Sequence, residues 1–143
     1  MQNKRLFGKI CYLERQMCRE SHQLFAEYGV SPVQMRTLIF IHVNELNGTA
    51  VCQKDIEKQL NLRASSVSTL LGNLEQDGFI ARAVSDGDAR IKNLTLTEKG
   101  KGVCEKNKLI FDKCDGVIQA ALTEEEQKQF EALIEKIIKT ISD

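Results

Sequence analysis

The chain has 143 residues, of which 42% are hydrophobic and 28% are charged. It is therefore long enough to bury a core of its own and too apolar to be disordered. Its 20 Lys and Arg residues balance 20 Asp and Glu residues, which excludes a strongly basic protein that adheres to polyanions through bulk charge alone.

The N-terminal segment and the cysteines indicate a compartment. No uninterrupted apolar stretch at the N-terminus has the length of a signal peptide, and no later segment approaches the roughly 18 apolar residues of a membrane span. The five cysteines form an odd set without a C-x-x-C pair, which fits a reducing compartment better than a disulfide framework. We therefore expect a cytoplasmic protein with no membrane partner and no structural disulfides.

Two helices are predicted in the first third of the chain. Apolar residues between positions 6 and 28 recur at steps of three, four and seven, which predicts one long helix that Gly29 ends. Residues 31–34, Ser-Pro-Val-Gln, have the pattern of a capping box and predict a second helix over residues 32–44. This helix is apolar nearly all round, so we expect it to be buried in the middle of the domain.

A helix-turn-helix pattern follows. Residues 53–60 and 64–76 have the apolar periodicity of two short helices, and only three residues separate them. Gly78 is placed to end the second of these helices as a C-terminal cap. The side chains of the second helix that we expect to face inward are Val67, Leu70, Leu71 and Leu74.

A single β-hairpin and two more helices complete the pattern. Residues 79–84 and 91–96 are predicted to be two strands, which a polar loop joins. Thr97 is placed to cap a long helix, and Thr123 opens a capping box for the last helix. One hairpin in an otherwise helical chain is typical of a wing.

The predicted fold is mainly α with a small β-wing, a winged helix-turn-helix with dimerisation helices at both ends. One domain spans residues 1–143, because no Ser- or Gly-rich linker, low-complexity run or repeat divides the chain. In this prediction residues 31–102 form the winged helix, and residues 1–30 and 103–143 form the dimerisation helices. The two ends carry more apolar surface than a core of this size needs, which indicates a homodimer. The alternative is that both ends pack only onto their own core.

The helix predicted over residues 64–76 presents small polar side chains outward. A helix that enters the major groove of DNA needs thin first turns, with hydroxyls and amides that reach base edges and phosphates. Arg63 directly precedes this helix, placed for a phosphate or a guanine, and the helix N-terminus adds amide donors. The alternative is that Ser and Thr gather at helix starts because they cap them. The candidate DNA-binding residues here are Arg63, Ser65, Ser66, Ser68, Thr69 and Asn73.

The predicted hairpin adds a second candidate contact with double-stranded DNA. Arg90 is placed at its tip, where a guanidinium can enter a narrow minor groove of negative potential. We expect Asp88 to orient Arg90 or the loop rather than to touch anionic DNA. Lys92, on the strand that follows, is a further candidate contact.

Four segments of the sequence form an ordered set: LNLRASSVS at residues 60–68, LEQDGFIAR at 74–82, DAR at 88–90 and LTLTEKG at 94–100. In this order they resemble the multiple-antibiotic-resistance-regulator (MarR) family, and the resemblance covers nearly the whole chain. It implies a homodimeric transcription regulator, more often a repressor, that binds a palindromic operator with two winged modules about one DNA turn apart. It also implies that Arg90 is the minor-groove arginine. Arg63 departs from the family pattern, in which Asp or Ser is usual.

The resemblance further implies that a small-molecule effector, a metal or an oxidant releases the DNA. Cys11 and Cys18 are candidates for redox sensing, and they lie about 10.5 Å apart along an intact helix, which excludes a disulfide between them within one chain. Either thiol can instead be oxidised or alkylated, or meet a partner across the dimer, as the resemblance to peroxide-sensing relatives allows. The alternative is that each packs as a small buried hydrophobe.

Other chemistry finds little support in the sequence. Glu14, Cys18 and His22 share one face of the first predicted helix and are weak candidates for part of a zinc site. Three ligands on one helix converge poorly on a tetrahedral ion, so we expect no metal and no cofactor.

Without a Gly-rich phosphate loop, nucleophile elbow or H-E-x-x-H pair, the sequence does not indicate an enzyme. The main alternative is a winged helix that serves protein association without DNA, which the neutral net charge favours.

Overall fold

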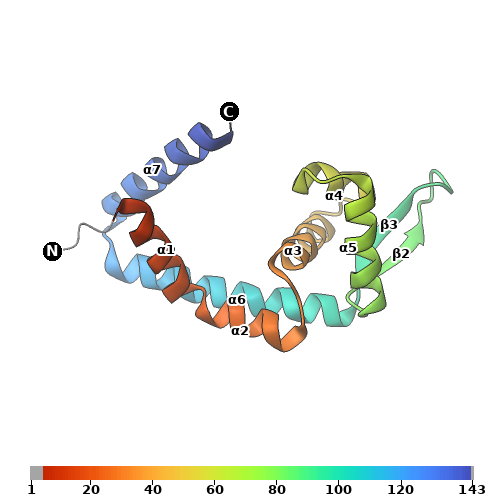
Figure 1. Cartoon of the computed structure of the whole chain (residues 1–143), viewed down its shortest axis with the longest axis horizontal. Helices are drawn as coiled ribbons and strands as arrows, with labels where there is room; N and C mark the ends of the chain where they lie inside the picture. Colours follow the sequence, from red (N-terminus) through yellow and green to blue (C-terminus); the bar gives the residue numbers. More distant parts are fainter. Residues whose placement is uncertain (1–4, 143) are drawn as a thin grey trace. The chain divides into compact units, whose positions relative to one another are not determined.

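The computed structural model describes residues 5–142 and contains, within this range, seven helices and three strands (Figure 1). The described residues form two units: Arg19–Asn107 make up one, which we call the winged-helix unit. The residues before and after it make up the other, which we call the terminal unit. In chain order the elements are α1 (Leu6–Met17), α2 (Arg19–Tyr28), α3 (Pro32–Leu46), β1 (Val51–Cys52), α4 (Gln53–Leu60), α5 (Ala64–Gln76), β2 (Ile80–Val84), β3 (Lys92–Leu96), α6 (Glu98–Ala121) and α7 (Glu124–Ser142).

The helix α3 begins as the sequence predicts. Gln34 N–H donates to Ser31 Oγ at 3.2 Å, and Ser31 N–H donates to Gln34 Oε1 at 2.9 Å. This reciprocal pair satisfies two amides that the start of a helix otherwise leaves without a partner. The helix continues to Leu46, two residues beyond its predicted end. Its buried side chains are Met35, Thr37, Leu38 and Ile41.

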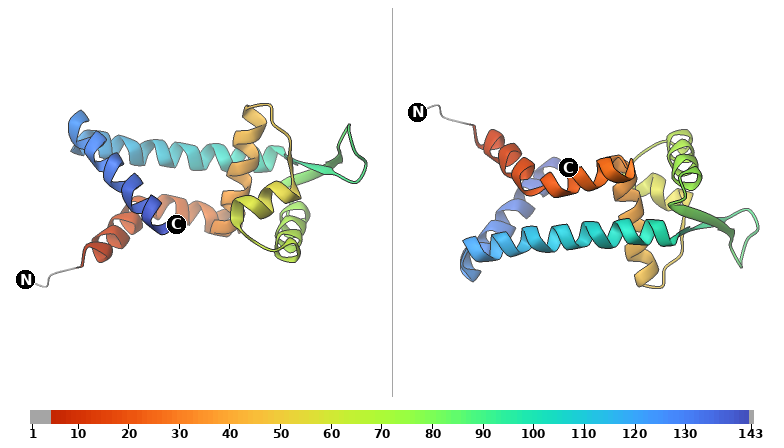
Figure 2. Two further views of the ribbon diagram at one scale, coloured as in Figure 1. Left: turned by 90° about the horizontal axis from the view of Figure 1, so that it is seen from above. Right: turned by 90° about the horizontal axis from the view of Figure 1, so that it is seen from below.

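Within the winged-helix unit, α3 crosses both α2 and the first part of α6 (Figure 2). The Nζ atom of Lys106 on α6 donates to Tyr28 Oη on α2 at 2.8 Å. The helix α3 also packs against β1 and β3, so it contributes to the core on the side of the sheet as well. The hairpin of β2 and β3 extends beyond these helices, as Figures 1 and 2 both show.

The helices α4 and α5 form the helix-turn-helix at the predicted positions. Asn61 ends α4 in the left-handed conformation, with φ 51°, and the N–H of the next residue donates to Glu57 O at 3.2 Å. Gly78 follows α5 with φ 79°, and Phe79 N–H donates to Leu74 O at 2.9 Å. Each reversal satisfies a carbonyl at a helix C-terminus and so determines where the helix stops.

The wing is a three-stranded antiparallel sheet in the order β1-β3-β2, which completes a winged-helix fold. The strands β2 and β3 form the predicted hairpin, with Ile80 opposite Leu96 at its base. The sequence did not predict β1, a strand of two residues in which Val51 pairs with Leu94. A strand this short shows no alternation of apolar and polar residues, and its partner is far along the chain.

The start of α6 lies directly against the end of α5. Thr97 Oγ1 accepts Gly100 N–H at 3.2 Å, so Thr97 caps α6 as predicted, and it donates to Gly78 O at 2.6 Å. A Cβ atom at Gly100 would overlap the carbonyl oxygen of Phe79. Only glycine therefore allows α6 to approach the turn that follows α5 this closely.

The terminal unit contains α1, the second part of α6, and α7. Thr123 and Glu126 form the predicted capping box, with Glu126 N–H donating to Thr123 Oγ1 at 3.2 Å and Thr123 N–H donating to Glu126 Oε2 at 2.9 Å. Among the described residues of α7, none is buried. Its exposed apolar side chains are Phe130, Leu133, Ile134, Ile137, Ile138 and Ile141. Across residues 5–142, no helix combines the length and apolarity needed to cross a bilayer.

The prediction of one unbroken helix between residues 6 and 28 is wrong, because the helix is interrupted at Cys18. The backbone of Cys18 has φ −91° and ψ 9°, so α1 ends at Met17 and α2 begins at Arg19. The Met17 carbonyl at the break accepts a hydrogen bond from Cys114 Sγ at 3.2 Å. Neither proline nor glycine marks this position. The contact with Cys114 accompanies the break, and the sequence did not predict it because a tertiary contact has no local sequence signal.

Candidate nucleic-acid interface

The helix α5 has one buried face and one exposed polar face. Val67, Leu71 and Leu74 are completely buried, whereas Leu70, which we also expected to face inward, is half-buried. Thr69 Oγ1 donates to the carbonyl of Ser65 at 3.1 Å, and its oxygen keeps the capacity to accept. The candidate contact residues at and after the start of α5 are all exposed: Arg63, Ser65, Ser66, Ser68, Thr69 and Asn73.

Arg63 is the residue that precedes the first turn of α5. Its side chain makes no capping hydrogen bond, because a guanidinium only donates and cannot accept from the amides of the first turn. Asp or Ser at this position would accept from an amide of the first turn. Arg63 instead adds positive charge at the end of the helix that already carries amide donors and a partial positive charge.

The wing tip is ordered by backbone hydrogen bonds and by one carboxylate. Ser85 N–H donates to Ile91 O at 2.8 Å, and Ile91 N–H donates to Asp88 O at 3.1 Å. Asp88 Oδ1 accepts the N–H of Arg90 at 2.9 Å. Asp88 therefore orients the loop that carries Arg90, while the Arg90 side chain is exposed.

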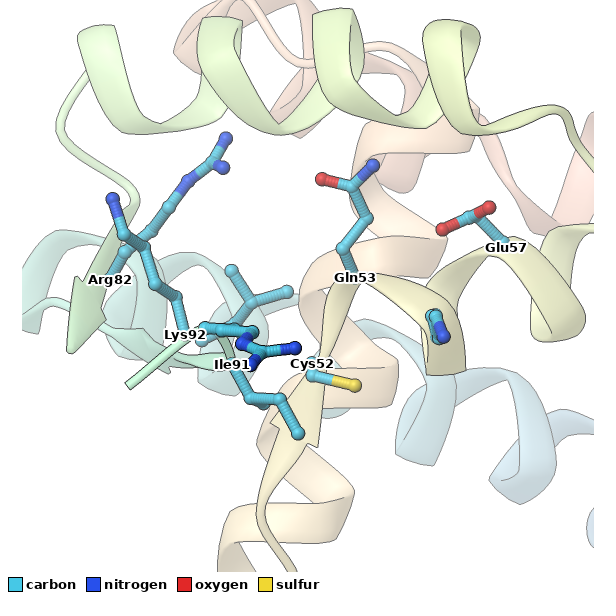
Figure 3. A pocket seen from close by; sticks show the side chains of 9 residues that line it. Cys52, Gln53, Glu57, Arg82, Ile91 and Lys92 are labelled. Carbon is cyan, nitrogen blue, oxygen red and sulfur yellow. The ribbon is translucent and has the colours of Figure 1, made fainter. Parts of the chain in front are cut away.

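A groove of about 340 Å³ lies between the wing and the start of α4. Figure 3 shows Arg82 and Lys92 on the wing side of this groove, opposite Gln53 and Glu57 on α4. Four cationic side chains and one carboxylate take part in the lining, so the groove favours anions. The charged residues that line it are Lys54, Glu57, Arg82, Arg90 and Lys92.

The sequence did not indicate all the residues that line this groove. Arg90 and Lys92 were expected contacts, but Lys54, Arg82 and Gln53 were not. Lys54 and Gln53 begin α4, and they reach the wing only because β1 pairs with β3 and brings the start of α4 beside it. The pairing of β1 has no signal in the sequence, so the groove could not be predicted from it.

One ion pair connects the wing to α5. Arg82 Nε on β2 lies 3.2 Å from Glu75 Oε2 near the end of α5, with the two side chains 24% and 47% exposed. The Nε atom is buried and its contact with Glu75 lacks the geometry of a hydrogen bond, so the interaction between the two side chains is a charge attraction. The contact joins the two elements that carry the candidate DNA-binding residues.

The candidates for redox or metal chemistry are placed as follows. Cys11 and Cys18 are free thiols, both half-buried. Of the weak zinc candidates, Glu14 and Cys18 belong to the terminal unit and His22 to the winged-helix unit. Among residues 5–142, no three His, Cys, Asp or Glu side chains are grouped so that they could hold a metal ion.

The fold and this exposed surface define a winged-helix transcription regulator, and comparison with known proteins identifies the family. Residues 28–91 match the family model described as MarR family. The transcriptional regulator BilQ of Clostridium symbiosum is 43% identical over 125 residues, which cover 85% of each chain. The Bacillus subtilis regulator YwhA is 40% identical over 89 residues, which cover 59% of this chain and 60% of that protein.

A solved structure agrees with the sequence comparisons. The crystal structure of a Staphylococcus aureus MepR–DNA complex is similar with a TM-score of 0.72 and 30% identity, and the match covers 95% of this chain and 97% of that chain. The chain belongs to the MarR family. This confirms both the family that the four sequence segments indicate and the predicted winged-helix fold.

Proposed function

We propose that this protein acts in the cytoplasm as a homodimeric regulator that binds a palindromic operator. Each winged-helix unit lays α5 in a major groove and its wing tip beside the adjoining minor groove, with two units about one DNA turn apart. One observation carries the proposal: a single unit combines an exposed polar face on α5 with a groove lined by four cations. The similarity to the MepR–DNA complex supports it.

The proposal gives each group of side chains a role. The hydroxyls and amides of α5 meet base edges, and Arg63 binds a phosphate or a guanine near the start of the helix. Arg90 enters the minor groove, and Lys92 binds the backbone. Lys54 and Arg82 join these contacts because they line the same groove. Local placement of a few cations in this way compensates for a net charge of zero.

Binding to the promoter region of the protein's own gene, measured by fluorescence anisotropy at several salt concentrations, tests the proposal. We expect Arg90→Ala to weaken binding by roughly tenfold or more and to reduce the salt slope by about one. Lys128→Ala removes one cation from α7 in the terminal unit and should change neither value. A protein that ignores duplex DNA even at low salt would instead support the protein-association alternative.

We further propose that binding represses transcription and that a small molecule or an oxidant releases the DNA. Both follow the usual mode of the family, and the release requires a dimer whose two conformations bind the effector unequally. Transcription in vitro from the same promoter should fall as the protein is added. A rise in transcript with added protein would contradict repression while leaving DNA binding in place.

A further inference from the structure

Two cysteines of the terminal unit are brought together by the fold. Cys18 stands at the break between α1 and α2, and Cys114 lies on α6. Both are half-buried, and both belong to the terminal unit although they are far apart in the sequence. Thiols that meet in this way can be oxidised to a disulfide if the two sulfur atoms reach each other.

The hydrogen bond at the break limits the distance between the two residues. Cys114 Sγ lies 3.2 Å from the carbonyl oxygen of Met17. In a trans peptide this oxygen lies about 2.8 Å from the Cα atom of the following residue. That residue is Cys18, so Cys114 Sγ lies within about 6 Å of the Cys18 Cα atom. From there, side-chain rotation and a small backbone shift bring the sulfurs into bonding range.

The Cys18 thiol gives a second sign of this proximity. Its pKa is raised, first by burial, then by the negative charge of Glu14, and also by its interaction with Cys114. Charge on Cys114 affects Cys18 only because the two side chains are close. The raised pKa makes Cys18 form the reactive thiolate less readily than an ordinary cysteine does, so we assign the second, intramolecular step to Cys18.

The remaining cysteines are less suited to pair with Cys18. Cys11 lies two helical turns earlier on α1, about 10.5 Å along the axis from Cys18. Cys52 and Cys104 belong to the winged-helix unit. Cys114, by contrast, donates a hydrogen bond to the Met17 carbonyl directly at the helix break. It is therefore the cysteine best placed to pair with Cys18.

We propose that Cys18 and Cys114 of one chain form a disulfide when the protein meets a low-molecular-weight disulfide such as oxidised glutathione. Cys114 loses its proton to solvent, and its sulfur attacks one sulfur of the oxidant, which forms a mixed disulfide and releases one thiolate that takes up a proton. Cys18 then loses its proton to solvent and attacks the Cys114 sulfur, which forms the Cys18–Cys114 bond and releases the second thiolate. The two cysteines lose two electrons, and the oxidant is reduced to two thiols.

The regulatory consequence of this bond rests on the proposed function. The helix α6 runs without interruption from Glu98 to Ala121, so it carries both Gly100, which lies against the end of α5, and Cys114. A bond at Cys114 ties this helix to the end of α1 and restricts the adjustment by which a dimer sets the spacing of its two α5 helices. We expect the oxidised protein to bind its promoter region at least about tenfold more weakly.

Peptide mapping of the full-length protein tests the bond itself. The reduced protein is incubated with oxidised glutathione, denatured, alkylated with iodoacetamide and digested with trypsin without reductant. Trypsin releases Cys18 within residues 16–19 and Cys114 within residues 114–128, so the linked pair has a distinctive mass. We expect this pair in protein that migrates as a monomer on a denaturing gel. Its mass should be about 2 Da below the summed masses of the two peptides with free thiols, because the bond removes two hydrogen atoms.

Single variants identify the partners. C18S and C114S should each lose the linked pair, whereas C11S, on the same helix as the break, should keep it. A linked pair that occurs only in covalent dimers overturns the intrachain bond. Glutathione adducts on separate cysteines, without the linked pair, overturn it as well.

DNA binding tests the switch separately. The oxidised wild-type protein should lose affinity and regain it with dithiothreitol, whereas C114S should bind equally before and after treatment. Crosslinked protein that binds as tightly as the reduced protein overturns the switch and leaves the bond standing. Reduced protein that binds no DNA contradicts the proposed function, and the peptide map then still decides the bond.

Discussion

Gly100 leaves no space for a side chain where α6 meets the turn after α5. The Phe79 carbonyl occupies the place of a Cβ atom, and the Leu96 side chain lies just beyond it. Because backbone atoms cannot move aside as a flexible side chain can, a methyl group here must displace one of the two elements. The position of α5, which carries the candidate DNA contacts, therefore depends on the absence of a side chain at one residue.

We expect Gly100→Ala to lower the free energy of unfolding by roughly 1–3 kcal/mol, because the added methyl group overpacks this contact. Urea denaturation gives the measurement. Gly102→Ala is a matched control on the same helix, where a Cβ atom meets nothing within 4 Å. Alanine there should leave stability unchanged or raise it by up to about 1 kcal/mol, since alanine favours helix. Equal effects of the two variants would contradict the argument from packing.

Cys104 is a buried thiol in the first part of α6. Burial raises its pKa to about 12, with further contributions from the negative charges of Glu45 and Glu105. We expect Cys104 to resist iodoacetamide at pH 8 in the native protein while the half-buried Cys52 reacts, because the thiolate is the nucleophile. In urea both should react, as mass spectrometry of the digest can show. Native labelling of Cys104 at the rate of Cys52 would count against its burial.

At the scale of elements, helix ends are determined by side chains within a few residues. The starts of α3 and α7 are fixed by capping boxes, and the ends of α4 and α5 by left-handed residues at Asn61 and Gly78. The link between elements is of a different kind: Arg82 and Glu75 connect the wing to α5 across a partly exposed ion pair. Such a pair adds little stability, so the covalent turn and the buried core do more to position the wing.

Removal of the cap of α7 tests the element scale. We expect Thr123→Ala to cost about 1 kcal/mol of stability, because it leaves the Glu126 amide without its acceptor. Thr140→Ala in the same helix is the matched control, since that hydroxyl only donates to the Lys136 carbonyl, which already lies within the helix. Thermal unfolding followed by circular dichroism compares the two. A larger loss for Thr140→Ala would show that the cap is not what stabilises the start of α7.

At the scale of the whole molecule, the terminal unit exposes many large apolar side chains. Phe7 is 74% exposed on α1 and Ile141 is 79% exposed on α7. Exposed apolar surface of this extent is typical of an interface, and a second copy of the chain is the partner we propose.

We expect Ile137→Glu to weaken the dimer, because it places a charge within the apolar stripe of α7 where the partner would bury it. Sedimentation equilibrium measures the shift from dimer to monomer. Lys128→Glu changes charge on an exposed polar position of the same helix and should leave the dimer intact. A monomeric wild-type protein would contradict the homodimer itself.

The sequence predicted most of the elements because their signals are local. Capping boxes at Ser31 and Thr123, the glycine after α5 and the apolar periodicity all involve residues within one or two turns of each other. The same local patterns, in their order, indicated the family, which the comparisons confirm. The exposure of the α5 face also followed from periodicity, whereas contact of these side chains with DNA stays a prediction.

Tertiary structure alone decided the features that join distant parts of the chain. The pairing of β1 with β3 creates the cationic groove, and the contact of Cys114 with Met17 accompanies the break at Cys18. The close approach at Gly100 likewise depends on a carbonyl in another element. The sequence by itself determined which segments are helix, turn or hairpin, because hydrogen bonds and periodicity act over a few residues. It did not determine these contacts, because they join residues that are far apart in the sequence and come close only in the folded chain.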